Sequence, residues 1–324
     1  MNIAAVYAAA CLSAALATAV SVPFWRRWCL KSGAMDDPGH RKIHTSPIPL
    51  AGGMAVMTGL LVALLAGVVV AVAGSRSSVA GLFDYGLSVR ATQLLSLTTG
   101  ALGMLLLGLL DDKRELTPLL KFGGQLVVAL VVAAAGMRIT LFVPSLLFSY
   151  GMTALWILTV VNAFNFMDNM NGLCAGLGAI SAGWFGLIAA GQGQYLVATM
   201  AFLVTGALLG FLPFNFPRAA AFLGDAGSHL TGYLLAVLAI LPHYYTHKNP
   251  RPLSVLTPLL VLAVPLGDLV WVVLLRWKNG QPFYIGDTNH LSHRLVRRGF
   301  TPARAVVLIW LLAAAAGALA FLWQ

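Results

Sequence analysis

Charged residues are scarce in this sequence. Asp, Glu, Lys and Arg together make up 9% of the 324 residues, and 59% of the residues are hydrophobic. Because about a quarter of the residues in a soluble domain are charged, this scarcity excludes an ordinary soluble globular protein. Several apolar runs instead reach the roughly 20 residues that a transmembrane helix needs. The sequence predicts an all-α, polytopic integral membrane helical bundle.

Cysteines are few, and internal repeats and low-complexity tails are absent. Cys11, Cys29 and Cys174 lie in or beside apolar runs without paired or metal-type spacing, which excludes a disulfide framework and a cysteine metal site. Lys and Arg outnumber Asp and Glu by 20 to 10, but they are divided among short segments between the apolar runs. This division argues against nucleic acid as a partner. We expect one integral membrane domain over residues 1–324.

No basic segment precedes the first apolar run, Asn2–Phe24, whereas Arg26 and Arg27 follow it. This order is the reverse of a cleavable signal peptide, so we expect a retained first helix with its N-terminus outside. The length rule predicts about ten transmembrane helices in all. The other nine are expected at Leu50–Ala73, Ala91–Leu110, Leu119–Ala135, Leu146–Phe166, Leu173–Ala190, Tyr195–Leu212, Ser228–Leu241, Leu253–Leu275 and Ala303–Leu322.

The charges between these spans predict the orientation of the bundle. Ten spans that start outside place 15 of the 20 Lys and Arg residues on the cytoplasmic side, a clear positive-inside bias with both termini outside. The same threading puts most acids on or near the cytoplasmic face, with Asp84 outside and Asp268 within the ninth span. Because acids have little influence on topology, their clustering is independent information. We therefore expect a functional site that faces the cytoplasm.

A polar stripe interrupts the apolar sequence at the end of the fifth span. On a helix, the steps of three from Asn162 to Asn165, Asp168 and Asn171 place these side chains along one slanted face. Such a face must contact protein or water, because unpaired polar groups in hydrocarbon are costly. The pattern is typical either of a ligand-binding wall or of a hydrogen-bonding seam between helices.

Two acidic segments indicate phosphate or metal chemistry. Asp111 and Asp112 follow the third span, where a divalent metal or the cation of Lys121 would offset the repulsion between adjacent carboxylates. Asp225 and Ser228 open the eighth span, where a carboxylate beside free helix N–H groups can hold Mg²⁺ against a phosphate. Solvated loop acids and simple N-capping by Asp225 are the structural alternatives.

Histidines and basic side chains occupy the first and last cytoplasmic segments. His290 and His293 share a helical face, but no Cys or HExxH pattern accompanies them, so phosphate contact or orientation fits better than zinc. Asp268 is expected to pair with a buried cation such as Arg276, with a proton relay as the alternative. Candidates for phosphate neutralisation, or alternatively for anchoring at the membrane surface, are Arg41, Lys42, Lys121, Arg294 and Arg297.

Five motifs in order along the chain resemble the polyprenyl-phosphate N-acetylhexosamine-1-phosphate transferases, the family of WecA, TagO and MraY. The likeness covers about residues 36–300. The motifs are Pro-Ile-Pro-Leu-Ala-Gly-Gly at 47–53, Gly-Leu-Leu-Asp-Asp at 108–112, Asn-Ala-Phe-Asn-Phe-Met-Asp at 162–168, Leu-Gly-Asp-Ala-Gly-Ser at 223–228 and His-Leu-Ser-His-Arg-Leu at 290–295.

The resemblance implies a multi-pass enzyme of the bacterial cytoplasmic (inner) membrane with a Mg²⁺-dependent cytoplasmic site, Mn²⁺ being the alternative ion. The enzyme would transfer N-acetylhexosamine 1-phosphate, by default GlcNAc 1-phosphate, from a UDP-sugar to undecaprenyl phosphate and release UMP. Membrane lipid is a further expected partner, and a homodimer is left open.

Site roles are carried over from the matching motifs. Asp111, Asp112 and His290 are expected to be catalytic, and Asp225 with Asp111 to hold the metal. Asp168 matches the acid on the nucleotide side. Further substrate contacts are expected from Asn162, Asn165, Asn171 and His293.

One position departs from the family pattern. The family usually has a second aspartate three residues after the Asp168 position, where this chain has Asn171. An amide can hydrogen-bond but supplies no negative charge, so a non-catalytic scaffold is one alternative. An MraY-type phospho-MurNAc-pentapeptide transferase is another, although the His-Leu-Ser-His pattern is closer to WecA and TagO. A proton-coupled transporter would be expected to show repeats and midplane charges, whereas this chain keeps its acids on one face.

Overall fold

The computed structural model describes residues 2–37, 46–73, 78–245 and 251–324. Arg41 and Lys42, which were predicted to neutralise phosphate, lie outside the described residues. The described chain is helical, as predicted for an all-α bundle. It contains α1 (Ile3–Ser32), α2 (Gly52–Ala73), α3 (Ser78–Arg114), α4 (Pro118–Ala134), α5 (Leu146–Met167), α6 (Leu173–Gly191), α7 (Tyr195–Phe211), α8 (Gly224–Ile240), α9 (Thr257–Val261), α10 (Ala263–Lys278), α11 (Leu291–Arg297) and α12 (Pro302–Trp323), with 3-10 helices at Leu212–Phe214 and Pro252–Leu256.

Most of the expected spans correspond to long apolar helices, so the protein is a multi-pass membrane protein. Seven helices of the described chain are long and apolar enough to cross a membrane. An eighth crossing follows if the segments Pro252–Val261 and Ala263–Lys278, bent by 74° at their junction, form one span. The remaining two expected spans correspond to α4 and α8, each 17 residues long. Helix length therefore accounts for seven or eight crossings rather than ten.

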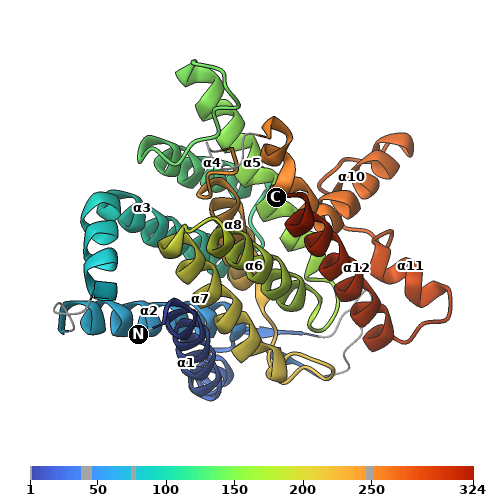
Figure 1. Cartoon of the computed structure of the whole chain (residues 1–324). Helices are drawn as coiled ribbons and strands as arrows, with labels where there is room; N and C mark the ends of the chain where they lie inside the picture. The colour runs from blue at the N-terminus through green and yellow to red at the C-terminus, as the bar shows by residue number, and fades with distance from the viewer. Residues whose placement is uncertain (1, 38–45, 74–77, 246–250) are drawn as a thin grey trace.

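Helix α8 is the buried centre of the bundle. Nearly all of its residues from Gly224 to Ala239 are buried, and it contacts α2, α3, α5 and α6. In Figure 1, α1, α2 and α3 lie on one side of α6 and α8, and α10, α11 and α12 lie on the other. A helix enclosed by others needs mainly apolar or small residues on every side, which α8 has after its first turn apart from the buried His229 and Tyr233.

The chain before α2 is hydrogen-bonded to the chain before α8. Strands β1 (Met35–Asp36) and β2 (Ile48–Pro49) pair antiparallel. A residue before proline, such as Ile48, favours the extended backbone of a strand. The N–H of Phe222 donates to the carbonyl of Pro49 at 2.9 Å, and the N–H of Gly52 donates to the carbonyl of Phe222 at 2.9 Å. These bonds bring β1 and the N-terminal turn of α8 to the same end of the bundle.

Helix α3 approaches the start of α8 closely because position 108 is glycine. A Cβ atom at Gly108 would lie 2.4 Å from both the Cα atom of Ala226 and the carbonyl oxygen of Asp225. Backbone atoms at that distance cannot be displaced without moving a helix. The glycine therefore sets the separation of the two helices.

We expect the substitution Gly108→Ala to destabilise the protein by at least about 1–3 kcal/mol, because the added methyl overpacks this contact. Gly123→Ala on α4 is the matched control, since a Cβ there meets no atom within 4 Å and alanine favours a helix by about 0.5–1 kcal/mol. Thermal unfolding in detergent micelles measures both effects. Equal unfolding temperatures for Gly108→Ala and the unaltered protein would contradict the close approach.

Candidate active site

A cavity of about 490 Å³ opens between α3, α5, α8 and the segment that joins α10 to α11. The lining also includes β1, the segment at 215–217 and the start of α12. Its described lining contains no Lys or Arg, and its one imidazole belongs to His293. Five carboxylates line it: Asp36, Asp112, Asp168, Asp225 and Asp287.

Asp112 caps the N-terminus of α8 from a neighbouring helix. It belongs to the end of α3 rather than to a loop, because α3 continues to Arg114. Its Oδ1 accepts a hydrogen bond from the N–H of Asp225 at 2.8 Å, and its Oδ2 accepts one from the N–H of Ala226 at 3.1 Å. Gly224 before them adopts φ +73°, and a Cβ there would lie 2.9 Å from the Asp112 Oδ2. N-capping by the Asp225 side chain, the structural alternative, is therefore wrong.

The Asp225 carboxylate is oriented by a side chain of α5. The Asn165 Nδ2 donates to the Asp225 Oδ1 at 2.5 Å and to the Ser228 Oγ at 3.0 Å. The Lys121 Nζ lies 3.6 Å from the Asp225 Oδ2, which is the other oxygen of the same carboxylate. The Asp225 side chain keeps 35% exposure, so it is held in place while facing the cavity.

Asp111 points away from its neighbour Asp112 and pairs with Lys121. The Lys121 Nζ lies 2.6 Å from the Asp111 Oδ2, and the N–H of Leu116 donates to the Asp111 Oδ1 at 2.9 Å. Lys121 also donates to the Asn165 Oδ1 at 3.4 Å. Neither Asp111 nor Lys121 is among the side chains that line the cavity. The metal role of Asp111 stays a prediction, and its geometry favours holding Lys121 near Asp225.

The polar stripe is helical only as far as Met167, where α5 ends. Asn162 lies deeper in the bundle and donates to the Gln125 Oε1 at 2.7 Å. Asn165, Asp168 and Asn171 line the cavity. The expectation of one helical face through Asn171 is therefore wrong, although three of the four side chains reach the same cavity.

The turn after α5 carries Asp168 and Asn171. Burial raises the pKa of Asp168 well above its usual range, and the negative charges of Asp225 and Asp112 raise it further. The Asn171 Nδ2 donates to the carbonyl of Pro217 at 3.2 Å. Buried Asn215 also joins the turn after α5 to the segment at 215–217, because its Oδ1 accepts a hydrogen bond from the N–H of Gly172 at 2.7 Å. The turn is thus attached to the segment opposite it.

The segment between α10 and α11 is attached to α10 by a histidine–carboxylate contact and a salt bridge. The His290 Nδ1 lies 2.6 Å from the Asp268 Oδ2, and the Arg276 Nε lies 2.8 Å from the Asp287 Oδ2. The expected pairing of Asp268 with Arg276 is therefore wrong. Partial burial favours a higher pKa for Asp287, but hydrogen bonds from Arg276 and Asn289 outweigh it and lower the pKa.

Of the predicted site residues on α11, His293 lines the cavity, whereas Arg294 and Arg297 do not. Burial lowers the pKa of the His293 imidazole, and the charges of His290 and Arg297 lower it further, so it favours the neutral form. The Arg294 guanidinium lies over the Trp271 ring, 4.6 Å from its centroid. Arg297 donates to the carbonyl of Thr288 at 2.6 Å. Neither arginine lines the cavity, so their predicted contact with phosphate stays a prediction.

Several lining residues carried no clear signal in the sequence. Asp36 lies near the end of the described residues 2–37, and only the pairing of β1 with β2 and the hydrogen bonds between the chain segments before α2 and α8 place it at the cavity. Asn169 bridges two cavity walls, because its Oδ1 accepts from the Ser292 Oγ at 2.7 Å. Asp287 lies close in sequence to His290 and His293, so its acidic side chain could have been predicted to belong to the same site. The lining residues that the sequence reading missed are Asp36, Asn169, Asn215, Asp287 and Thr288.

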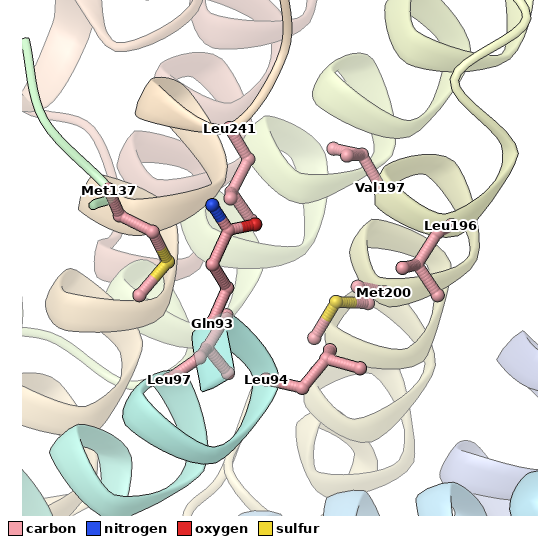
Figure 2. A pocket seen from close by; sticks show the side chains of 8 residues that line it. All are labelled: Gln93, Leu94, Leu97, Met137, Leu196, Val197, Met200 and Leu241. Carbon is pink, nitrogen blue, oxygen red and sulfur yellow. The ribbon is translucent and has the colours of Figure 1, made fainter. Parts of the chain in front are cut away.

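A second cavity is much smaller than the one lined by the five carboxylates. It has a volume of about 10 Å³ between α3, α7 and the ends of α4 and α8, and seven of its eight lining side chains are apolar (Figure 2). Gln93 is the polar exception, and its Oε1 is buried without a hydrogen-bond partner. A water molecule needs two to four polar partners to be held. This cavity is therefore a packing gap and not a ligand site.

The carboxylates at the large cavity fit a magnesium ion that is shared with a substrate. Among the described residues, no three His, Cys, Asp or Glu side chains form a complete protein cage for a metal. Mg²⁺ is typically held by one or two carboxylates and completes its shell with water and substrate phosphates. Asp225 and Asp168 line the same cavity, and the charge of Asp225 acts on Asp168. These two side chains fit that mode of binding.

Comparison with known proteins identifies the family. Residues 94–243 match the model of glycosyl transferase family 4. The chain is 32% identical to a probable undecaprenyl-phosphate N-acetylglucosaminyl 1-phosphate transferase of Bacillus subtilis, over 92% of this chain and 79% of that protein. It is 30% identical to the undecaprenyl-phosphate alpha-N-acetylglucosaminyl 1-phosphate transferase of Escherichia coli K12, over 94% and 80%. It is 31% identical to a decaprenyl-phosphate N-acetylglucosaminephosphotransferase of Mycobacterium tuberculosis H37Rv, over 93% and 78%. The chain therefore belongs to the family of polyprenyl-phosphate N-acetylglucosamine-1-phosphate transferases, as its five motifs suggested.

Proposed function

We propose that this protein transfers N-acetylhexosamine 1-phosphate, with GlcNAc as the default sugar, from a UDP-sugar to undecaprenyl phosphate. The relatives named above act on polyprenyl phosphates and N-acetylglucosamine according to their names. The observation that carries the proposal is a 490 Å³ cavity lined by five carboxylates and, among its described residues, by no Lys or Arg. A UDP-sugar is anionic, so such a cavity suits it once a divalent cation is present.

The reaction needs little covalent chemistry from the protein. A phosphate oxygen of the lipid attacks the β-phosphorus of the UDP-sugar, and the bond between that phosphorus and the bridging oxygen breaks as UMP leaves. A phosphate monoester is already nucleophilic at neutral pH, so direct displacement requires mainly positioning and charge stabilisation. Asn165 would hold Asp225 in place, while Lys121 would add a positive charge beside it.

Magnesium is proposed as the cofactor, with manganese as the alternative ion. Asp225 and Asp168 would hold the ion together with the diphosphate, and the bound ion would stabilise negative charge on the departing UMP. We also propose that this end of the bundle faces the cytoplasm of a bacterial inner membrane. A threading of ten spans, in which α4 and α8 also cross the membrane, divides the basic residues 15 to 5 and supports that orientation.

Purified protein in detergent is expected to release UMP when it is given Mg²⁺, undecaprenyl phosphate and UDP-GlcNAc. A panel with UDP-GalNAc and UDP-MurNAc-pentapeptide identifies the donor, and turnover of the pentapeptide donor alone would indicate the MraY-type reaction. Protein that unfolds cooperatively yet releases no UMP with any donor would favour the non-catalytic scaffold.

Asp225→Asn is expected to lower UMP release by about 100-fold or more, because one carboxylate that holds the cation is lost. Asp111→Asn is the comparison, since Asp111 contacts Lys121 and is not among the side chains that line the cavity. A raised Mg²⁺ requirement in Asp111→Asn would support its predicted metal role, whereas a lower kcat at an unchanged Mg²⁺ requirement would assign Asp111 to holding Lys121. Unchanged activity in Asp225→Asn would remove Asp225 from the metal site.

Asn171→Asp is expected to reduce the Mg²⁺ concentration needed for half-maximal activity, by about two- to tenfold. A further carboxylate on the cavity wall would attract the cation, although the bond to the Pro217 carbonyl is lost. Asn171→Leu, which loses the same bond without adding charge, serves as the control. Titration of UMP release against Mg²⁺ measures both variants, and a higher requirement in Asn171→Asp would contradict the expectation.

A further inference from the structure

Asp268 has both of its carboxylate oxygens engaged at the entrance to α11. Its Oδ2 lies 2.6 Å from the His290 Nδ1, and its Oδ1 accepts a hydrogen bond from the N–H of Leu291 at 2.6 Å. Asp268 and His290 are both buried, with 5% of each residue exposed. A buried carboxylate with two short contacts leaves its partner ring little freedom to rotate.

The His290 ring is enclosed between α10 and α5. It packs edge-on against the Phe166 ring, with centroids 5.6 Å apart, and Phe166 lies two residues before Asp168 at the cavity wall. The residues that follow His290 reach the cavity from the other side. His293 lines the cavity, and the Ser292 Oγ donates to the Asn169 Oδ1 at 2.7 Å.

We infer that Asp268 is a positioning residue that selects the tautomer and orientation of His290 for the transfer reaction. A carboxylate accepts a hydrogen bond from a protonated nitrogen. Asp268 therefore keeps the ring hydrogen on the His290 Nδ1 and leaves Nε2 free to contact the substrate. The inference rests on the proposed function and on the catalytic role expected of His290 from its motif. The His290 ring is not among the side chains that line the cavity, but its centroid lies 6.3 Å from that of His293, which does line it. It assigns a role to an acid within the membrane span, where such groups are rare and are usually paired.

A purely structural role for Asp268 predicts a different pattern of variants. If Asp268 served only to cap the first N–H of α11, an asparagine would replace it well, because its carbonyl oxygen can still accept from Leu291. The asparagine NH₂ would then face the His290 Nδ1 and force that nitrogen to accept, moving the ring hydrogen to Nε2. Asp268→Asn therefore preserves the cap while it reverses the tautomer.

The test measures UMP release with UDP-GlcNAc, undecaprenyl phosphate and Mg²⁺ for Asp268→Asn, His290→Gln and the double variant. Asp268→Asn is expected to lower kcat by about 10- to 100-fold with little change in KM, the range found when the carboxylate partner of a functional histidine is lost. The double variant is expected to be no slower than His290→Gln alone, because Asp268 acts through the ring that has been removed.

Ser292→Ala is the matched control. It loosens α11 by removing the bond to Asn169 and does not touch the His290 ring, so its effect should multiply with that of His290→Gln. Thermal unfolding in detergent checks that each variant folds. If Asp268→Asn fails to fold, Asp268→Glu tests the inference in the opposite sense, because its carboxylate can still accept from Nδ1. It is then expected to retain most of the kcat, and a loss as large as that of His290→Gln would overturn the positioning role.

The outcomes separate this inference from the proposed function. If the unaltered protein is active, two results would overturn the positioning role of Asp268. One is full kcat in a folded Asp268→Asn variant. The other is a double variant whose loss of kcat equals the product of the two single losses. An unaltered, folded protein that releases no UMP overturns the proposed function and this inference with it.

Discussion

The site depends on one contact, the carboxylate of Asp112 against the first turn of α8. The first N–H groups of a helix have no partner within the helix, and leaving them unpaired among apolar neighbours is unfavourable. Here a side chain from α3 accepts two of them, and glycine at position 108 lets the helices approach closely enough. The position of Asp225 follows from this contact, and the bonds from Asn165 and Lys121 complete it.

The acids of the site have different partners. Some hold the structure together, and others face the cavity. Asp111 is paired with Lys121, Asp268 with His290 and Asp287 with Arg276. Asp225 and Asp168 face the cavity, and the raised pKa of Asp168 reflects burial together with the negative charge around it. The close pairs hold the framework, whereas Asp168 and Asp225, the latter 3.6 Å from Lys121, present their carboxylates to the cavity and contribute to its negative field. A cavity of this kind can accept an anionic diphosphate only together with a cation.

The sequence predicted the helices and drew attention to part of the cavity wall, because apolar length and polar interruptions are local features. Six side chains that the sequence singled out line the cavity: Asp112, Asn165, Asp168, Asn171, Asp225 and His293. The errors concern partners that the chain brings together from afar. The expected partner of buried Asp268 was a buried cation such as Arg276. The segment that folds back onto α10 instead supplies His290 to Asp268 and Asp287 to Arg276. Likewise, no local pattern indicates that Asp112 caps a helix that begins more than a hundred residues later.

The asparagine at position 171 fits this arrangement, although the family pattern has an acid there. α5 has already ended at Met167, so the side chain belongs to a turn and faces the segment at 215–217. Its NH₂ group donates to the Pro217 carbonyl, and a carboxylate could not make that bond because it has no hydrogen to donate. Asn215 and Asn169 attach the same turn to its neighbours on either side. An amide at 171 thus strengthens the cavity wall and leaves the negative field to Asp168 and Asp225, so the departure changes how the turn is held more than which groups meet the substrate.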